Sequence, residues 1–190
     1  IWVGGVMLVA ILKPHARLEG LVDPKPHQLF FGRYFLFFVM SQIQAAVIVA
    51  GDLLVLRIQC VEPALLFATG AITSLVFSLL IYALTVSFGD VGKAVVVVVM
   101  VLQIAGSSGT FPIELLPDVY QKIYHIFPFP YAIDAVRECV CGLYGTTWLK
   151  NIGCLLIFGA AALVIGLLVR KPFMGLNHFM EEKLKETEML

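Results

Sequence analysis

Long apolar runs alternate with short polar connections along most of this chain. The apolar runs cover, to within a few residues, 1–12, 31–56, 64–88, 94–104 and 148–169. A helix needs about 20 largely apolar residues to cross a hydrocarbon core of about 30 Å. The pattern therefore predicts an all-α, polytopic membrane protein, with five transmembrane helices in a domain over residues 1–170 and a tail over 171–190.

The first run is too short for a complete crossing. Residues 1–12 would form a helix of about 18 Å, and Lys13, His15 and Arg17 follow them. A secretory signal peptide would instead carry its positive charge before the apolar run. We expect this run to be the cytoplasmic end of a transmembrane helix, in a chain that is truncated at its N-terminus.

Residues 105–147 interrupt the membrane pattern. The sequence AGSSGTFPIELLP brings small residues and two prolines together, and an amphipathic stretch follows it. Pro128 and Pro130 are expected to end that stretch, and a second short helix is expected from Tyr131 to Gly142 or Gly145. Non-helical backbone survives at membrane depth only where protein buries it or it lines water. We therefore predict an outer re-entrant helical hairpin at about 110–145.

The composition supports the membrane assignment and excludes other classes. The chain is 60% hydrophobic and 14% charged, with a mean hydropathy of +0.95, whereas soluble domains average about 45–50% apolar and about 25% charged residues. The net charge is zero and no basic stripe is present. A nucleic-acid partner is therefore not expected, and the lipid bilayer is the expected surrounding.

The basic residues predict the orientation. With five crossings, the connections at 13–33 and 89–93 and the tail share one side, which holds nine of the 13 Lys and Arg residues; the opposite side holds four. Positively charged residues accumulate on the cytoplasmic side of short loops. We therefore expect these connections and the tail to be cytoplasmic in a bacterial plasma membrane.

Three polar residues interrupt the second apolar run. Ser41, Gln42 and Gln44 lie on an otherwise apolar segment. Polar side chains at membrane depth face either other helices or a water-filled path. The pattern leaves both roles open, and these three are the candidate residues of a substrate path.

One serine and one histidine deserve comparison with a protease site. The sequence GSSG at 106–109 fits the Gly-x-Ser-Gly pattern of rhomboid proteases, and a nucleophilic Ser108 would need a histidine base nearby. His125 is the only histidine expected on the outer side. A polar position at the membrane surface explains His125 as well, and small residues end a helix without catalysis. We therefore predict no catalytic residue and no enzyme.

The four cysteines do not have the spacing of a metal site. They are Cys60, Cys139, Cys141 and Cys154. Neither a metal nor another cofactor is expected. Cys60 could form a disulfide with Cys139 or Cys141 on the outer side; buried free thiols are the alternative.

The interrupted region and its flanks carry a recognisable motif. The motif consists of small residues, spaced prolines, an aromatic residue and a later arginine, at Gly106, Gly109, Pro112, Leu116, Pro117, Pro128, Pro130, Tyr131 and Arg137. With the order of the apolar runs, it resembles the C-terminal membrane domain of the YhgE/Pip family, the phage infection proteins. It is similar, more loosely, to the permease domains of type-2 ABC transporters.

This resemblance implies a function and its partners. It implies a six-helix domain with a large extracellular region after the first helix, acting as the permease-like subunit of an exporter of unknown substrate. The subunit would pair with a second copy or a related membrane subunit, and the motif region would form an outer gate. The resemblance places the contact with an ATPase at 13–28. That ATPase would be a separate chain, because this sequence has no phosphate-binding Gly-Lys-Ser/Thr loop. The alternative is a non-transporting anchor for the extracellular region, as a phage receptor or a secretion-system component.

Overall fold

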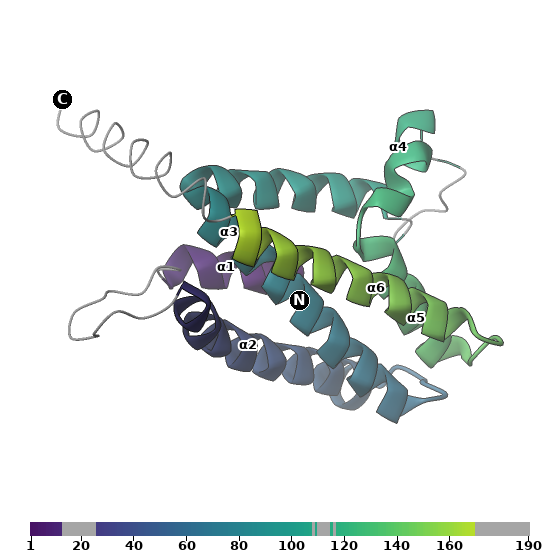
Figure 1. Cartoon of the computed structure of the whole chain (residues 1–190). Coiled ribbons are helices and arrows are strands. Elements are labelled where there is room, and N and C mark those ends of the chain that lie inside the picture. Colours follow the sequence, from purple (N-terminus) through teal and green to yellow (C-terminus); the bar gives the residue numbers. More distant parts are fainter. Residues whose placement is uncertain (13–25, 108, 110–114, 116, 170–190) are drawn as a thin grey trace.

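The computed structural model describes residues 1–12, 26–107, 109, 115 and 117–169, and its regular elements are all helical (Figure 1). They are α1 (Trp2–Ile11), α2 (Pro26–Ala50), α3 (Pro63–Gly106), α4 (Asp118–Ile123), α5 (Phe129–Cys141) and α6 (Thr147–Val164). A π-helical segment extends α2 over Gly51–Val55 and another extends α6 over Ile165–Val169, while a 3₁₀ turn, Tyr124–Ile126, follows α4. The predicted all-α fold class is confirmed.

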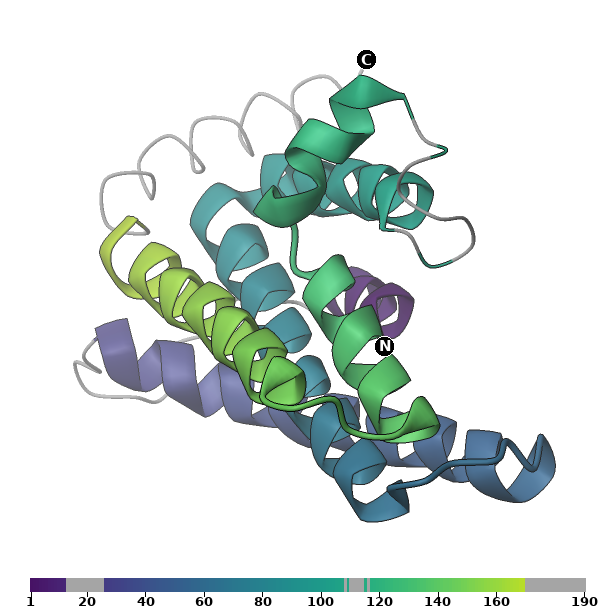
Figure 2. The same cartoon turned by 90° about the vertical axis from the view of Figure 1, so that its right-hand side faces the viewer.

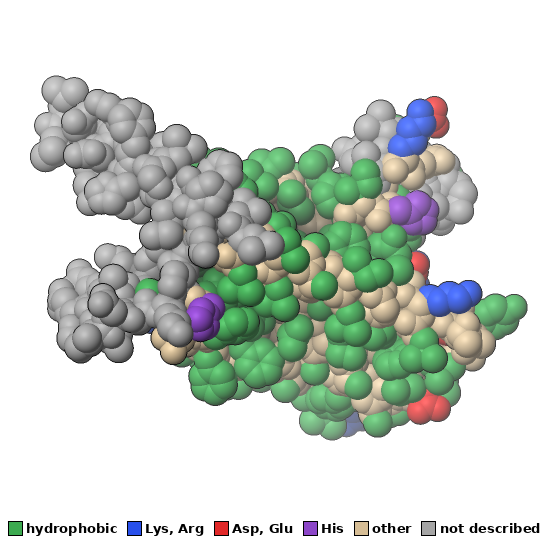
Figure 3. Space-filling view, viewed as in Figure 1, with side chains coloured by type: hydrophobic (Ala, Val, Ile, Leu, Met, Phe, Trp, Pro, Cys, Tyr) green, Lys and Arg blue, Asp and Glu red, His purple; other side chains and the backbone are tan. Residues whose placement is uncertain are grey.

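Three of the described helices are long and apolar enough to cross a membrane. These segments are His27–Val55, Pro63–Ile104 and Thr147–Leu167, and α1 is a shorter apolar helix. Figure 3 shows apolar side chains over the middle of the visible face, with most of its visible charged side chains at one end. The second and fifth predicted runs thus correspond to membrane-length helices, whereas the count of five crossings stays a prediction.

The predicted loop at 89–93 is not a loop in the structure. The runs predicted at 64–88 and 94–104 are the two limbs of α3, with non-helical dihedral angles at Gly89 alone (φ 60°, ψ −132°). Figure 1 shows the α3 ribbon turning back at this elbow. The Gly-Asp-Val-Gly-Lys sequence suggested a loop, but a glycine accepts positive φ without a Cβ clash. One residue therefore suffices for the turn, and helix resumes at once.

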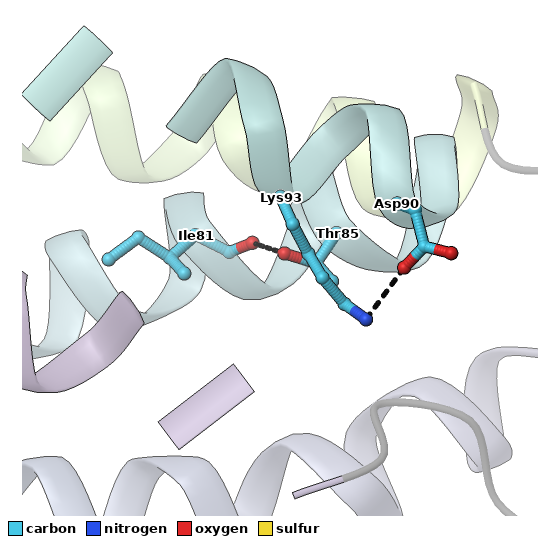
Figure 4. Close-up of polar contacts among 4 residues, drawn as sticks. All are labelled: Ile81, Thr85, Asp90 and Lys93. Carbon is cyan, nitrogen blue, oxygen red and sulfur yellow. Dashed lines mark hydrogen bonds and ion pairs between the residues drawn. The ribbon is translucent and has the colours of Figure 1, made fainter. Parts of the chain in front are cut away.

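Close backbone packing, rather than the visible ion pair, dominates the elbow. Lys93 Nζ donates to Asp90 Oδ1 at 2.8 Å (Figure 4), and both side chains are exposed, so this pair contributes only about 0–1 kcal/mol. At Gly92, by contrast, a Cβ atom would overlap the carbonyl oxygen of Leu84 and lie 2.8 Å from its carbonyl carbon. The two limbs therefore approach each other more closely than any side chain at Gly92 would allow.

The core centres on α3, which contacts α1, α2, α5 and α6. Near the elbow, the ring of Tyr82 lies 5.1 Å from those of Phe30 and Phe37 and 5.5 Å from that of Tyr34, between centroids. The Tyr82 hydroxyl also donates to the Phe30 carbonyl oxygen at 3.2 Å. A Cβ at Gly166 would lie 2.5 Å from the Phe30 ring. This cluster joins the start of α2, the first limb of α3 and the end of α6.

The connections gather at two ends of the bundle. At one end, the N–H groups of Val61 and Glu62 donate to the carbonyl oxygens of Val140 and Cys139, at 3.3 and 3.1 Å. At the other end, Ser87 Oγ donates at 3.2 Å to the carbonyl oxygen of Ile165, in the segment that extends α6. Figure 1 shows the elbow of α3 at the left and the connection between α5 and α6 at the right. The 89–93 region and the connections after α2 and α5 therefore lie at opposite ends of the bundle.

Replacing Gly92 with alanine tests the elbow. Because the new Cβ would meet backbone atoms of Leu84, we expect Gly92→Ala to lower the free energy of unfolding by about 1–3 kcal/mol, measured by denaturation in detergent micelles. The matched control is Gly153→Ala on α6, where a Cβ would meet nothing within 4 Å. This control should be neutral or slightly stabilising. Equal losses in the two variants would contradict the close packing.

Candidate functional site

Two of the three candidate path residues bind α3. Ser41 is buried, its Oγ donates to the Phe38 carbonyl oxygen at 2.9 Å, and its own carbonyl oxygen accepts a hydrogen bond from Ser74 Oγ at 2.7 Å. Gln42 Nε2 donates to the Ala71 carbonyl oxygen at 3.1 Å. The structure thus places both residues in the contact between α2 and α3.

The third candidate, Gln44, lies against α1. A Cβ at Gly4 would overlap the side-chain amide of Gln44, so the absence of a side chain at Gly4 makes room for that amide. All three residues therefore participate in helix contacts, which is one of the two roles that the sequence left open. Their role as path residues stays a prediction.

The first two residues of the gate motif, Gly106 and Gly109, lie at and just after the end of α3. Gly106 is buried and is the last residue of α3, and Gly109 is exposed. A Cβ at Gly109 would lie 3.2 Å from Ile133 Cδ1, so the chain passes close to α5 here. Pro112 and Leu116 lie outside the described residues.

The prolines of the motif flank helix starts. Pro117 is exposed and directly precedes α4, while Pro128 is the N-terminal cap of α5. The expected break at Pro128 is present, but Pro130 does not extend it: the second helix begins at Phe129 rather than Tyr131, with Pro130 in its first turn. The physical reason is that the first N–H groups of a helix have no partner within the helix, so proline loses nothing there.

Of the two remaining motif residues, Tyr131 contacts the preceding helical turn and Arg137 pairs within α5. The Tyr131 hydroxyl donates to the His125 carbonyl oxygen at 3.0 Å, and burial raises the pKa of Tyr131, so this hydroxyl keeps its proton. Arg137 pairs with Asp134, three residues earlier on α5, at 3.1 Å, with both side chains exposed. Gly142, at φ 111°, caps the end of α5. A helical pair is present, whereas its re-entrant position in a membrane stays a prediction.

The possible protease site gains no support from the described contacts. Ser108 lies outside the described residues, and its neighbour Ser107 is buried. His125 is exposed; its ring lies 5.1 Å from that of Tyr124, and its backbone accepts from Tyr131. Within the described ranges, His, Cys, Asp and Glu side chains also form no group of three that could hold a metal ion.

Cys60, in the connection that follows α2, lies beside the end of α5. Cys60 Sγ donates to the Cys139 carbonyl oxygen at 3.2 Å, whereas Cys141 is exposed, and all of these thiols are free. Of the two expected disulfide partners of Cys60, the structure therefore brings Cys139 close. Burial raises the pKa of the Cys139 thiol, which keeps this group protonated and unreactive at neutral pH.

Two contacts made by Thr69 and Gln103 were not predicted from the sequence. Thr69 Oγ1 accepts from Trp148 Nε1 at 2.9 Å and lies 3.3 Å from Cys139 Sγ, linking α3, α5 and α6. Gln103 is 1% exposed, and its Oε1 accepts the N–H of Phe129 at 3.2 Å, at the first residue of α5. Gln103 could have been found as a lone amide in an apolar run.

The predicted ATPase contact is only partly visible. Residues 13–25 lie outside the described residues, and the rest of 13–28 forms the start of α2. That start lies next to Phe30, which packs on Tyr82 of α3 and against Gly166 of the segment after α6. A force applied at the beginning of α2 would therefore reach two other helices directly.

Comparisons with known proteins identify a family and a relative of this chain. Residues 21–168 match the family described as ABC-2 family transporter protein. The chain is also 30% identical over 149 residues to the "Uncharacterized protein YhgE" of Bacillus subtilis (strain 168). That alignment covers 78% of this chain and 19% of the relative, so the chain spans about a fifth of that protein's length.

No solved structure matches the chain significantly. The family match covers most of the chain, including α2, α3, α5 and α6 and the motif residues between Gly106 and Arg137. The similarity to YhgE confirms the resemblance that the motif indicated. The chain therefore belongs to the ABC-2 family of transporter proteins, as a membrane domain similar to that of YhgE.

Proposed function

We propose that this chain is the permease-like membrane subunit of an exporter in the bacterial plasma membrane. The observation that carries the proposal is the match to the ABC-2 transporter family over residues 21–168. The apolar, membrane-length helices supply the spanning part that such a subunit needs. The substrate is not part of the proposal.

In the proposed mechanism, two such subunits enclose a path between them. The subunits are two copies of this chain, or one copy and a related membrane protein. The hairpin at about 110–145 is the outer gate, and Ser41, Gln42 and Gln44 line the path. Because Ser41 and Gln42 are hydrogen-bonded to α3, exposing them to a path requires α2 to separate from α3. Each such bond contributes about 0.5–1.5 kcal/mol net, which a driven conformational change can overcome.

The proposed energy source is a separate ATPase that docks at residues 13–28. The sequence contains no Gly-Lys-Ser/Thr phosphate-binding loop of its own. The packing of Phe30 on Tyr82 and beside Gly166 supports this location, because motion at the start of α2 would move α3 and α6.

Copurification tests the ATPase partner. We expect a separate ABC-type ATPase to copurify with the protein from its native membranes. Replacing residues 13–25 with a glycine-serine linker of equal length should lower its recovery at least about tenfold, a loss of about 1.4 kcal/mol in binding. The matched control, Asp134→Ala with Arg137→Ala, changes an exposed pair on α5 and should leave recovery unchanged. Undiminished recovery with the linker would refute docking at this segment.

A non-transporting anchor is the second candidate. One observation favours it: all three candidate path residues of α2 take part in contacts with other helices. Such an anchor would hold an extracellular region as a phage receptor or a secretion-system component. It needs no ATPase, so failure to recover any ATPase with the unmodified protein would favour the anchor over the permease.

Thiol labelling tests the proposed orientation. Cys141 is exposed at the end of α5, and the proposed topology places this end outside the cell. We expect a membrane-impermeant maleimide to label this protein in intact cells, and the Cys141→Ser substitution to remove most of that labelling. Cys139 should contribute little, because it is buried and its pKa is raised. Labelling of Cys141 only after cell lysis would show the reverse orientation.

A further inference from the structure

Three deeply buried side chains have a polar atom without a hydrogen-bond partner. They are Trp2 (2% exposed), Thr73 (4%) and Gln103 (1%), with Nε1, Oγ1 and Nε2 as the unpartnered atoms. A fourth such atom, Asn151 Nδ2, lies on α6. Leaving an amide or hydroxyl unpaired away from water costs roughly 2–7 kcal/mol. Most buried polar atoms in proteins are therefore paired, and a group of exceptions requires an explanation.

Two of the three side chains lie beside one aromatic cluster, and the third is on the same helix face as one of its rings. The Trp2 ring packs edge-on against the rings of Phe77 and Phe129, at 5.0 and 5.3 Å between centroids, and those two rings stack at 5.1 Å. Gln103 Oε1 accepts the N–H of Phe129 at 3.2 Å, so its amide nitrogen is beside the same residue. Thr73 lies one helical turn before Phe77, on the same face of α3.

The cluster joins elements that are distant in the sequence. Trp2 belongs to α1, Thr73 and Phe77 to the first limb of α3, Gln103 to its second limb and Phe129 to the start of α5. Figure 2 shows the beginning of α1 next to α5. An occupant here would therefore contact both limbs of α3 and the second helix of the proposed gate.

The unpartnered atoms define what they can bind. An indole N–H only donates, and so does the amide nitrogen of glutamine, while the threonine hydroxyl can donate or accept. The matching ligand atom is therefore a hydrogen-bond acceptor. The buried polar side chains of the described residues are all uncharged Ser, Thr or Gln. The buried residues of the described part of the chain include no Lys or Arg, so a full negative charge would lack a cationic partner and be very costly to bury. This favours a neutral acceptor.

We propose that Trp2, Thr73 and Gln103 form a binding site inside the bundle for an uncharged oxygen acceptor. The ligand is an amphipathic molecule with a hydroxyl, ether or carbonyl oxygen, whose apolar part lies against the rings of Trp2, Phe77 and Phe129. This site goes beyond the proposed function and does not depend on it, because binding requires neither transport nor an ATPase.

Fluorescence quenching tests the site in the full chain reconstituted in lipid nanodiscs. The chain has 2 tryptophans, so the Trp148→Phe variant retains Trp2 alone as the fluorophore. The probe is 10-bromodecan-1-ol, whose bromine quenches indole emission, and 1-bromodecane is the matched probe without a hydroxyl group. We expect saturable quenching by the alcohol and only linear, unsaturable quenching by the bromoalkane.

Isosteric variants connect the quenching to the named atoms. Thr73→Val removes the hydroxyl with little change of shape, and we expect it to weaken binding of the bromoalcohol about 3- to 10-fold, as loss of one neutral hydrogen bond implies. The control is Thr85→Val, on the same limb of α3, because Thr85 Oγ1 already donates to the Ile81 carbonyl oxygen at 2.8 Å (Figure 4). This control should bind the probe as the unmodified site does.

A stability measurement that retains Trp148 provides an independent readout. We expect 1-decanol to raise the unfolding temperature of the chain in nanodiscs, n-decane to leave it unchanged, and Thr73→Val to reduce the effect of decanol. Identical quenching by the two bromoprobes would overturn the proposal. The proposal would also be overturned if the Thr73→Val variant bound the alcohol as tightly as the unmodified protein. A third contrary result would be that Thr73→Val raises the unfolding temperature without changing the effect of decanol, because that is expected if Thr73 Oγ1 is merely an unpaired polar atom.

Discussion

Hydrogen bonds between side chains and backbone carbonyl groups join α2 to α3, and the remaining elements are arranged around that pair. Gln42 donates to Ala71, and Ser74 donates to Ser41. Tyr34 donates to the Leu75 carbonyl oxygen in the same contact, at 3.2 Å. Between apolar helices in lipid, burial of apolar surface provides no driving force for association. Directional bonds of this kind therefore determine which faces of the two helices meet.

With α2 in place, α3 positions the elements that carry the proposed gate. Its elbow at Gly89 returns the chain so that Gln103, on the second limb, reaches the first residue of α5. Thr69, on the first limb, holds Trp148 of α6 and lies beside Cys139 of α5. The second helix of the proposed gate, α5, is therefore attached to both limbs of α3. A movement of α2 relative to α3 would be transmitted to the gate through these few polar contacts.

Parts of the candidate site were predictable because they depend on neighbours in the sequence. Asp134 and Arg137 are three residues apart on one helix, so their pairing follows from helix geometry. The prolines likewise indicated the break before α5, although Pro130 fits the first turn of that helix instead of preceding it. The partners of Gln103 and Trp148 are 26 and 79 residues away. No local pattern predicts which distant helix such a side chain will meet.

By itself, the sequence determined the all-α fold class, the positions of the main apolar helices and the transporter family. These depend on the length of apolar runs and on local backbone preferences, which each segment carries within itself. Only the tertiary structure decided that a single non-helical residue, Gly89, separates the two limbs of α3 and that Ser41 and Gln42 bind α3. It also decided that Trp2 of α1 and Gln103 of α3 meet at Phe129, the first residue of α5. The rotation and pairing of helices depend on contacts between distant segments, and these exist only once the chain has packed.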